Sequence, residues 1–127
     1  MRIEFMQCNC SNEEGVTLIY SCSGVANTGL IADRVMRNLV REKVCRGSCL
    51  SGVASDASGF IQSALAANKN VVIDGCSVAC GKKIFEKREI PFEHIVITDL
   101  GVEKGKTIVT DELVQQMTEV IKEKIQK

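Results

Sequence analysis

Three short apolar runs constrain this chain most strongly: VTLIY at residues 16–20, VVI at 71–73 and HIVIT at 94–98. Each run is rich in β-branched residues, and the first two end in loops that contain glycine and cysteine. Short apolar runs bounded by turn residues are typical of buried β-strands. We therefore expect three buried strands, separated by segments long enough to hold helices.

Amphipathic segments fill the gaps between these runs. Apolar residues recur at helical spacing in residues 28–43, 55–68, 77–87 and 111–126, which predicts four helices. Residues 44–53 are punctuated by glycine and predict a brief strand followed by a loop. Strands that alternate with helices form parallel sheets with right-handed crossovers. The expected fold is α/β: a small three-layer α/β/α sandwich with a largely parallel, Rossmann-like sheet.

Length, charge and hydropathy bound the other properties. The chain has 127 residues, 45% of them hydrophobic, which suits one domain over residues 16–127. Residues 1–15 precede it as a polar arm or an edge element. Sixteen basic residues balance sixteen acidic ones without a long block of either sign, so we expect neither nucleic acid nor membrane as a partner. Without a signal peptide or a long apolar stretch, the chain is expected in the cytoplasm.

The seven cysteines are the unusual feature of the composition. In a reducing cytoplasm we expect them to stay free rather than to form a disulfide framework. A free thiol there is buried as a small apolar group, acts as a nucleophile or binds a metal. Each cysteine can be assigned to one of these roles from its position.

Four cysteines fall where the predicted strands end. Cys22 follows the first strand, Cys49 lies in or after the brief second one, and Cys76 follows the run that ends at Asp74. Cys80 stands four residues after Cys76, one helical turn away if this turn is helical. Parallel strands end at one edge of a sheet, so the four thiolates can converge on a zinc ion there. Any one of them taken alone is better explained as a small buried apolar residue, but that explanation is far less suited to all four at one edge.

The segments VVIDGCSVAC, CSGVANTG and CLSGV resemble the DGC-domain family, named for its central Asp-Gly-Cys. The likeness covers roughly residues 16–101. The family is regarded as zinc-binding because of four candidate chelating cysteines, which correspond here to Cys22, Cys49, Cys76 and Cys80. The resemblance implies this ligand set and no reaction.

Two further residues are candidates for supporting this site. Asp74 either orients a ligand around the thiolates or caps the helix that follows, and Asn27 either lies beside the site or caps the helix at residues 28–43. His94, the only histidine, is expected at the opposite edge of the sheet and is not a predicted ligand.

The remaining three cysteines have no counterpart among the four matched positions. For Cys45 a buried apolar role is favoured over a spare ligand. Cys8 and Cys10 lie in the polar arm, where they could fold over the site, shuttle a soft metal or take no part.

The sequence thus predicts a zinc-binding protein with a four-cysteine site. The metal ion is an expected partner, and a protein partner is left open. An iron–sulfur redox or sensing protein is the first alternative, because four thiolates suit iron as well. A thiol enzyme or a carrier of metal or sulfur is the second, with Cys22 or Cys76 as nucleophile and Cys8 or Cys10 resolving it. No catalytic constellation is recognisable, so whether the protein is an enzyme is left open.

Overall fold

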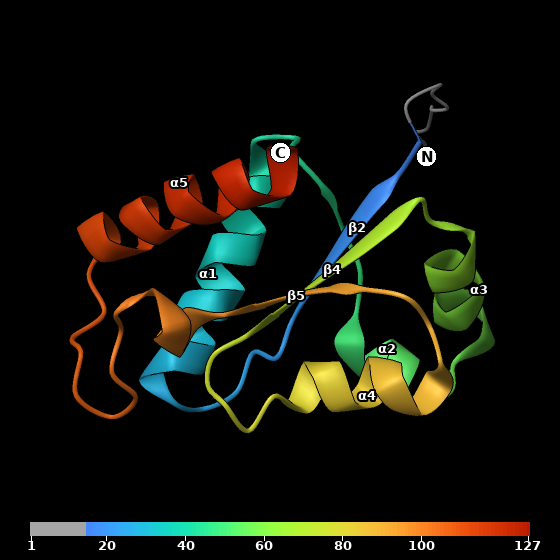
Figure 1. Ribbon diagram of the computed structural model, residues 1–127, viewed down its shortest axis with the longest axis horizontal. Helices are drawn as coiled ribbons and strands as arrows, with labels where there is room; N and C mark the ends of the chain where they lie inside the picture. The colour runs from blue at the N-terminus through green and yellow to red at the C-terminus, as the bar shows by residue number, and fades with distance from the viewer. Residues whose placement is uncertain (1–14) are drawn as a thin grey trace.

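The computed structural model describes residues 15–127, and Figure 1 shows it as a parallel sheet between two layers of helices. The sheet has the order β3-β2-β4-β5, and each neighbouring pair is parallel. In these residues the strands are β2 (Thr17–Ser21), β3 (Arg46–Gly47), β4 (Lys69–Asp74) and β5 (Glu93–Val96). The predicted arm, Gly15 excepted, lies outside the described residues.

Helices cover both faces of this sheet. They are α1 (Asn27–Arg41), α2 (Leu50–Ala54), α3 (Ser58–Ala66), α4 (Cys80–Arg88) and α5 (Asp111–Gln126), with the short 3-10 helix η1 (Ile97–Leu100) after β5. In Figure 1, α1 and α5 lie on one side of the strands, and α2, α3 and α4 lie on the other. The predicted three-layer α/β sandwich is therefore confirmed.

Successive side chains of a strand point to opposite faces of the sheet, so each face packs against a different set of helices. Ile19, Val71 and Ile73 pack with α1 and α5 in one core. Leu18, Tyr20 and Val72 pack with α2, α3 and α4 in the other. The Tyr20 ring meets the Phe85 ring of α4 edge to face, with 4.8 Å between the ring centroids. Both faces of the central strands are thus buried.

The strand order creates a topological switch point between β2 and β4, the two central strands of the sheet. From β2 the chain moves outward to β3, and it then crosses back to form β4 on the other side of β2. The connections leaving β2 and β4 therefore diverge at their carboxyl ends. In open parallel sheets such a divergence is where ligands bind.

Several boundaries differ from those predicted. The strand in residues 44–53 is only two residues long, and α2 follows it in place of a loop. The predicted strand at residues 94–98 turns into η1 after Val96. Helix α4 begins at Cys80, three residues later than predicted, because Ala79 takes a left-handed conformation with φ of 57°. Cys76 and Cys80 are therefore not successive turns of one helix.

None of the helices within residues 15–127 has both the length and the apolar character needed to cross a membrane.

Candidate cysteine site

The carboxyl edge of the sheet gathers the four cysteines predicted as ligands. Cys22 directly follows β2, Cys49 comes two residues after β3, and Cys76 comes two residues after β4. Cys80 is the first residue of α4. Cys22 and Cys76 thus flank the switch point between β2 and β4, and Cys49 and Cys80 stand at the starts of the neighbouring helices.

The backbone of the β4–α4 turn holds the sulfur of Cys22. The backbone amide of Cys22 donates to the Ile73 carbonyl at 3.0 Å, and the Gly75 amide donates to Cys22 Sγ at 3.3 Å. Gly75 also packs against the start of α1, where a Cβ would lie 2.6 Å from the Thr28 carbonyl carbon, so this position has no room for a side chain. The sulfur of Cys22 therefore lies against the residue that immediately precedes Cys76.

Cys76 is half-buried and surrounded by donors. The pKa of its thiol lies below the ordinary value of 9.0, chiefly because the backbone N–H of Val78 bonds the sulfur. Lys104 Nζ, 3.4 Å from Sγ, lowers the pKa further, whereas burial and the charge of Asp74 oppose the shift. The thiolate is the form that binds metals and attacks electrophiles, so these donors favour the chemically active form.

Asn27 acts on a distant loop rather than on its own helix. Ala26 is the N-cap residue of α1, and no side chain caps that helix end. The Asn27 side chain instead donates to the carbonyls of Thr107 at 2.8 Å and Glu103 at 3.1 Å, and it accepts from the Gly105 amide at 2.7 Å. The capping interpretation is wrong, and Asn27 holds the loop that carries Lys104.

Asp74 caps α4, as one of the two interpretations predicted. Its carboxylate is almost fully buried and accepts from the amides of Gly81 at 2.8 Å and Lys82 at 3.0 Å. These bonds satisfy amides that have no partner inside the helix and place a negative charge at its positive end. Asp74 thereby fixes the point where α4 starts, next to Cys80.

His94 contacts the same carboxylate, so its predicted place at the far edge of the sheet is wrong. His94 Nε2 lies 2.7 Å from Asp74 Oδ2. In the register of β4 and β5 His94 faces Val72, whose side chain points to the same face as that of Asp74. The imidazole is long enough to reach diagonally along this face toward the carboxyl edge.

The four sulfurs do not form a closed set. Cys49 and Cys80 are exposed, whereas Cys22 and Cys76 are half-buried. Across residues 15–127, no three histidine, cysteine, aspartate or glutamate side chains converge closely enough to hold a metal ion. The donor types suit zinc or iron. The Cys22 sulfur contacts the backbone of Gly75, next to Cys76, whereas Cys49 and Cys80 are exposed to solvent.

Cys45 belongs to the hydrophobic core. It is 5% exposed and packs in the cluster formed by α1, α5 and the sheet. Burial raises the pKa of its thiol to about 11. The favoured interpretation of Cys45 as a small buried apolar residue is confirmed, while Cys8 and Cys10 lie outside the described residues.

Lys104 is the neighbour of the site that sequence reasoning missed. It lies 28 positions from Cys76 in a polar loop, and nothing in its local pattern distinguishes it from Lys106. Only the folded loop brings its ammonium group to the sulfur. The two glycines of this loop, Gly101 and Gly105, both have positive φ and were the one available sign of a tight turn.

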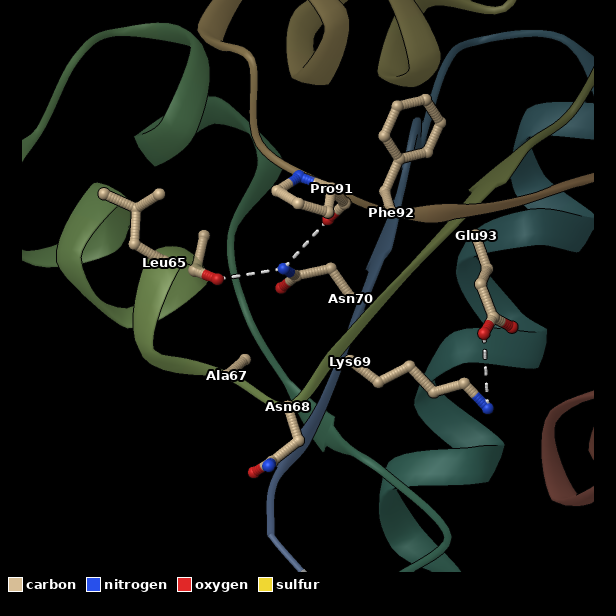
Figure 2. Close-up of a pocket in the computed structure, with 9 residues that line it drawn as sticks. Leu65, Ala67, Asn68, Lys69, Asn70, Pro91, Phe92 and Glu93 are labelled. Atoms are coloured by element: carbon tan, nitrogen blue, oxygen red, sulfur yellow. Dashed lines mark hydrogen bonds and ion pairs between the residues drawn. The ribbon is translucent and has the colours of Figure 1, made fainter.

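A pocket of about 260 Å³ opens at the opposite edge of the sheet, away from the cysteines. Figure 2 shows Asn70 beside Pro91 in this pocket. The Asn70 side-chain amide donates to the carbonyl of Ala64 at 2.9 Å and to that of Pro91 at 3.2 Å. The Asn70 oxygen accepts from the Tyr20 hydroxyl, and Lys69 pairs with Glu93 at 3.5 Å. These polar groups are engaged in holding strands and helices together, and we assign the pocket no function.

The fold and the site define a class: a parallel α/β domain with thiols at the switch point of its sheet. The chain belongs to the DGC-domain family, whose model matches residues 18–121. It is also similar to a protein of Pseudomonas aeruginosa named anaerobic and virulence modulator AnvM. The two are 27% identical over 95 residues, which cover 74% of this chain and 72% of that protein. No solved structure gives a significant match.

Proposed function

We propose that this protein binds one metal ion, zinc, through the thiolates of Cys22, Cys49, Cys76 and Cys80. The observation that supports the proposal most is the position of all four at the carboxyl edge of a parallel sheet, with Cys22 and Cys76 on either side of its switch point. Bound to four protein ligands, zinc would act as a structural or binding centre rather than as a catalyst. The proposal includes a cytoplasmic location, where thiols stay reduced.

Local hydrogen bonding supports Cys22 and Cys76 as the inner pair of ligands. Each sulfur accepts a backbone N–H, from Gly75 and Val78 respectively. For Cys76 this bond lowers the pKa of the thiol and so favours the anionic form that a metal needs. Cys80, the first residue of α4, stands at the same edge of the sheet as this pair.

The exposed pair, Cys49 and Cys80, would complete the site by turning inward. Zinc binds cysteine as the thiolate, so binding of the ion would itself deprotonate these two thiols. Both residues stand at the starts of helices at the carboxyl edge of the sheet, so the proposal requires their side chains to move toward the inner pair.

Elemental analysis of protein purified without oxygen tests this proposal. The wild-type chain should carry about one zinc, and Cys76→Ser and Cys80→Ser should lose most of it because each removes one of four ligands. Cys45→Ala is the matched control, since it removes a core cysteine and should leave the metal content unchanged. Folded wild-type protein that contains no metal would overturn the proposal.

An iron–sulfur cluster on the same cysteines is the second candidate. The observation that favours it is the name of the relative, which links that protein to anaerobic conditions, and such clusters respond to oxygen. Visible absorption separates the two metals. A brown protein that bleaches on reduction supports the cluster, and a colourless protein loaded with zinc excludes it.

A thiol-based enzyme or carrier is the third candidate, favoured by the lowered pKa of the half-buried Cys76. Competitive alkylation of metal-replete protein with iodoacetamide, followed by mass spectrometry of each cysteine peptide, tests it. Rapid modification of Cys76 alone at neutral pH supports a nucleophile. Uniform protection of all four edge cysteines supports the metal site.

A further inference from the structure

We propose that Asn27 and Lys104 work as a positioning pair: Asn27 fixes the loop at residues 101–110 so that the Lys104 ammonium group remains at the sulfur of Cys76. Lys104 would there offset the negative charge of the metal-bound thiolates and strengthen zinc binding. This inference rests on the proposed metal-binding function and assigns two residues to it that are not themselves ligands.

The loop is anchored on both sides of Lys104. The Asn27 side-chain oxygen accepts a hydrogen bond of 2.7 Å from the amide of Gly105, the residue that follows Lys104. Asn27 also donates to the carbonyl of Glu103, the residue that precedes it, at 3.1 Å. One side chain therefore holds the backbone immediately before and after Lys104, which fixes where its own side chain starts.

Bonds within the loop make this anchor rigid. The Glu103 amide donates to Thr107 Oγ1 at 2.8 Å, and the Thr107 amide donates to the Glu103 carbonyl at 3.1 Å. The Thr107 carbonyl is itself held by Asn27 at 2.8 Å. Residues 103–107 thus form a closed turn that Asn27 attaches to the start of α1.

The start of α1 is in turn tied to the turn that carries Cys76. A Cβ at Gly75 would lie 2.6 Å from the carbonyl carbon of Thr28, so the backbones are in direct contact. Asn27 and Cys76 are each one residue from this contact. The geometry therefore links the loop, helix α1 and the cysteine turn in one small region, in which Lys104 Nζ lies 3.4 Å from Cys76 Sγ.

The positive charge of Lys104 is what would make its contact with Cys76 matter for zinc binding. Four thiolates around a zinc ion leave a net charge of about −2, and groups that hydrogen-bond to the ligands tune such sites. An ammonium group that donates to one sulfur offsets part of that charge without competing for the metal. The charge of Asp74 disfavours the Cys76 thiolate, so Lys104 is the charged side chain near Cys76 that favours an anionic site.

Chelator competition under anaerobic conditions measures the effect on zinc affinity. Lys104→Met and Asn27→Ala should each weaken binding roughly 10-fold, the effect typical of changing a group that supports a metal ligand. The double variant should be little weaker than either, because both changes remove the same contact. Lys104→Arg keeps the charge and should retain most of the affinity, and Lys106→Met, an exposed lysine of the same loop, should bind like wild type.

Amide hydrogen exchange provides a readout that needs no metal. Exchange at Gly105 should accelerate in Asn27→Ala and remain slow in Lys104→Met, because Asn27 and not Lys104 accepts this amide. Unchanged exchange in Asn27→Ala would overturn the anchoring step. Wild-type affinity in Lys104→Met would overturn the charge role while leaving the metal site intact, whereas wild-type protein that binds no zinc would overturn the proposed function and this inference together.

Discussion

His94 Nε2 and Asp74 Oδ2 lie 2.7 Å apart, and this contact joins β5 to the residue that sets the start of α4. The Asp74 carboxylate also accepts hydrogen bonds from the amides of Gly81 and Lys82, so it makes three polar contacts with two elements. A carboxylate buried this deeply is stable only when its oxygens are satisfied. Asp74 is thus the residue that ties the sheet to the helix bearing Cys80.

Replacing Asp74 should therefore cost more than replacing its histidine partner. Asp74→Ala removes the acceptor of two helix-end amides and should lower the free energy of unfolding by about 2–4 kcal/mol. His94→Ala leaves both amide bonds in place and should cost about 1 kcal/mol. Urea denaturation of metal-free protein measures both values. Equal losses in the two variants would contradict the capping role of Asp74.

Gly75 offers a second test, of the contact between the cysteine turn and α1. In Gly75→Ala the new methyl group would meet the Thr28 backbone, so we expect a loss of about 1–3 kcal/mol in the free energy of unfolding. Gly24→Ala is the matched control, because a Cβ there has no neighbour within 4 Å, and it should change stability by less than about 0.5 kcal/mol. Thermal unfolding compares the two, and an unaffected Gly75→Ala would show that the contact does not exist.

The fold was predictable because its signals are local. Apolar runs marked β2, β4 and β5, and helical spacing marked α1 and α5, so the parallel sandwich followed from their alternation. The start of α4 was missed because a left-handed alanine, Ala79, precedes it, and alanine carries no signal for that conformation.

The candidate site was predictable only in part, for a related reason. Strand ends located Cys22 and Cys76, and the buried role of Cys45 agreed with its apolar surroundings. The positions of His94 and Lys104 depend on strand register and on a loop anchored 76 to 80 residues away by Asn27. Contacts at such separations leave no periodic trace in a single sequence.

Ionisation of Cys45 should lower the free energy of unfolding at alkaline pH. Its thiol has a pKa of about 11 in the folded chain against 9.0 ordinarily, so the unfolded chain loses this proton first as the pH rises. The contribution of the protonated Cys45 thiol to the free energy of unfolding is fully present below pH 9. It is lost between about pH 9 and 11, a change of roughly 3 kcal/mol.

Urea denaturation of wild type and Cys45→Ala across this range isolates the effect from other groups that titrate there. The wild-type protein should lose stability more steeply above pH 9, so the difference between the two proteins should shrink. Parallel curves would show that the Cys45 thiol is not buried as described.

The central claim is that thiolates at the carboxyl edge of the sheet bind zinc, and X-ray absorption at the zinc edge of anaerobically purified protein tests it most directly. We predict an inner shell of four sulfur atoms at about 2.3 Å, with the sulfur count reduced in Cys76→Ser and unchanged in Cys45→Ala. An inner shell of oxygen and nitrogen alone, or folded protein without zinc, would contradict the claim.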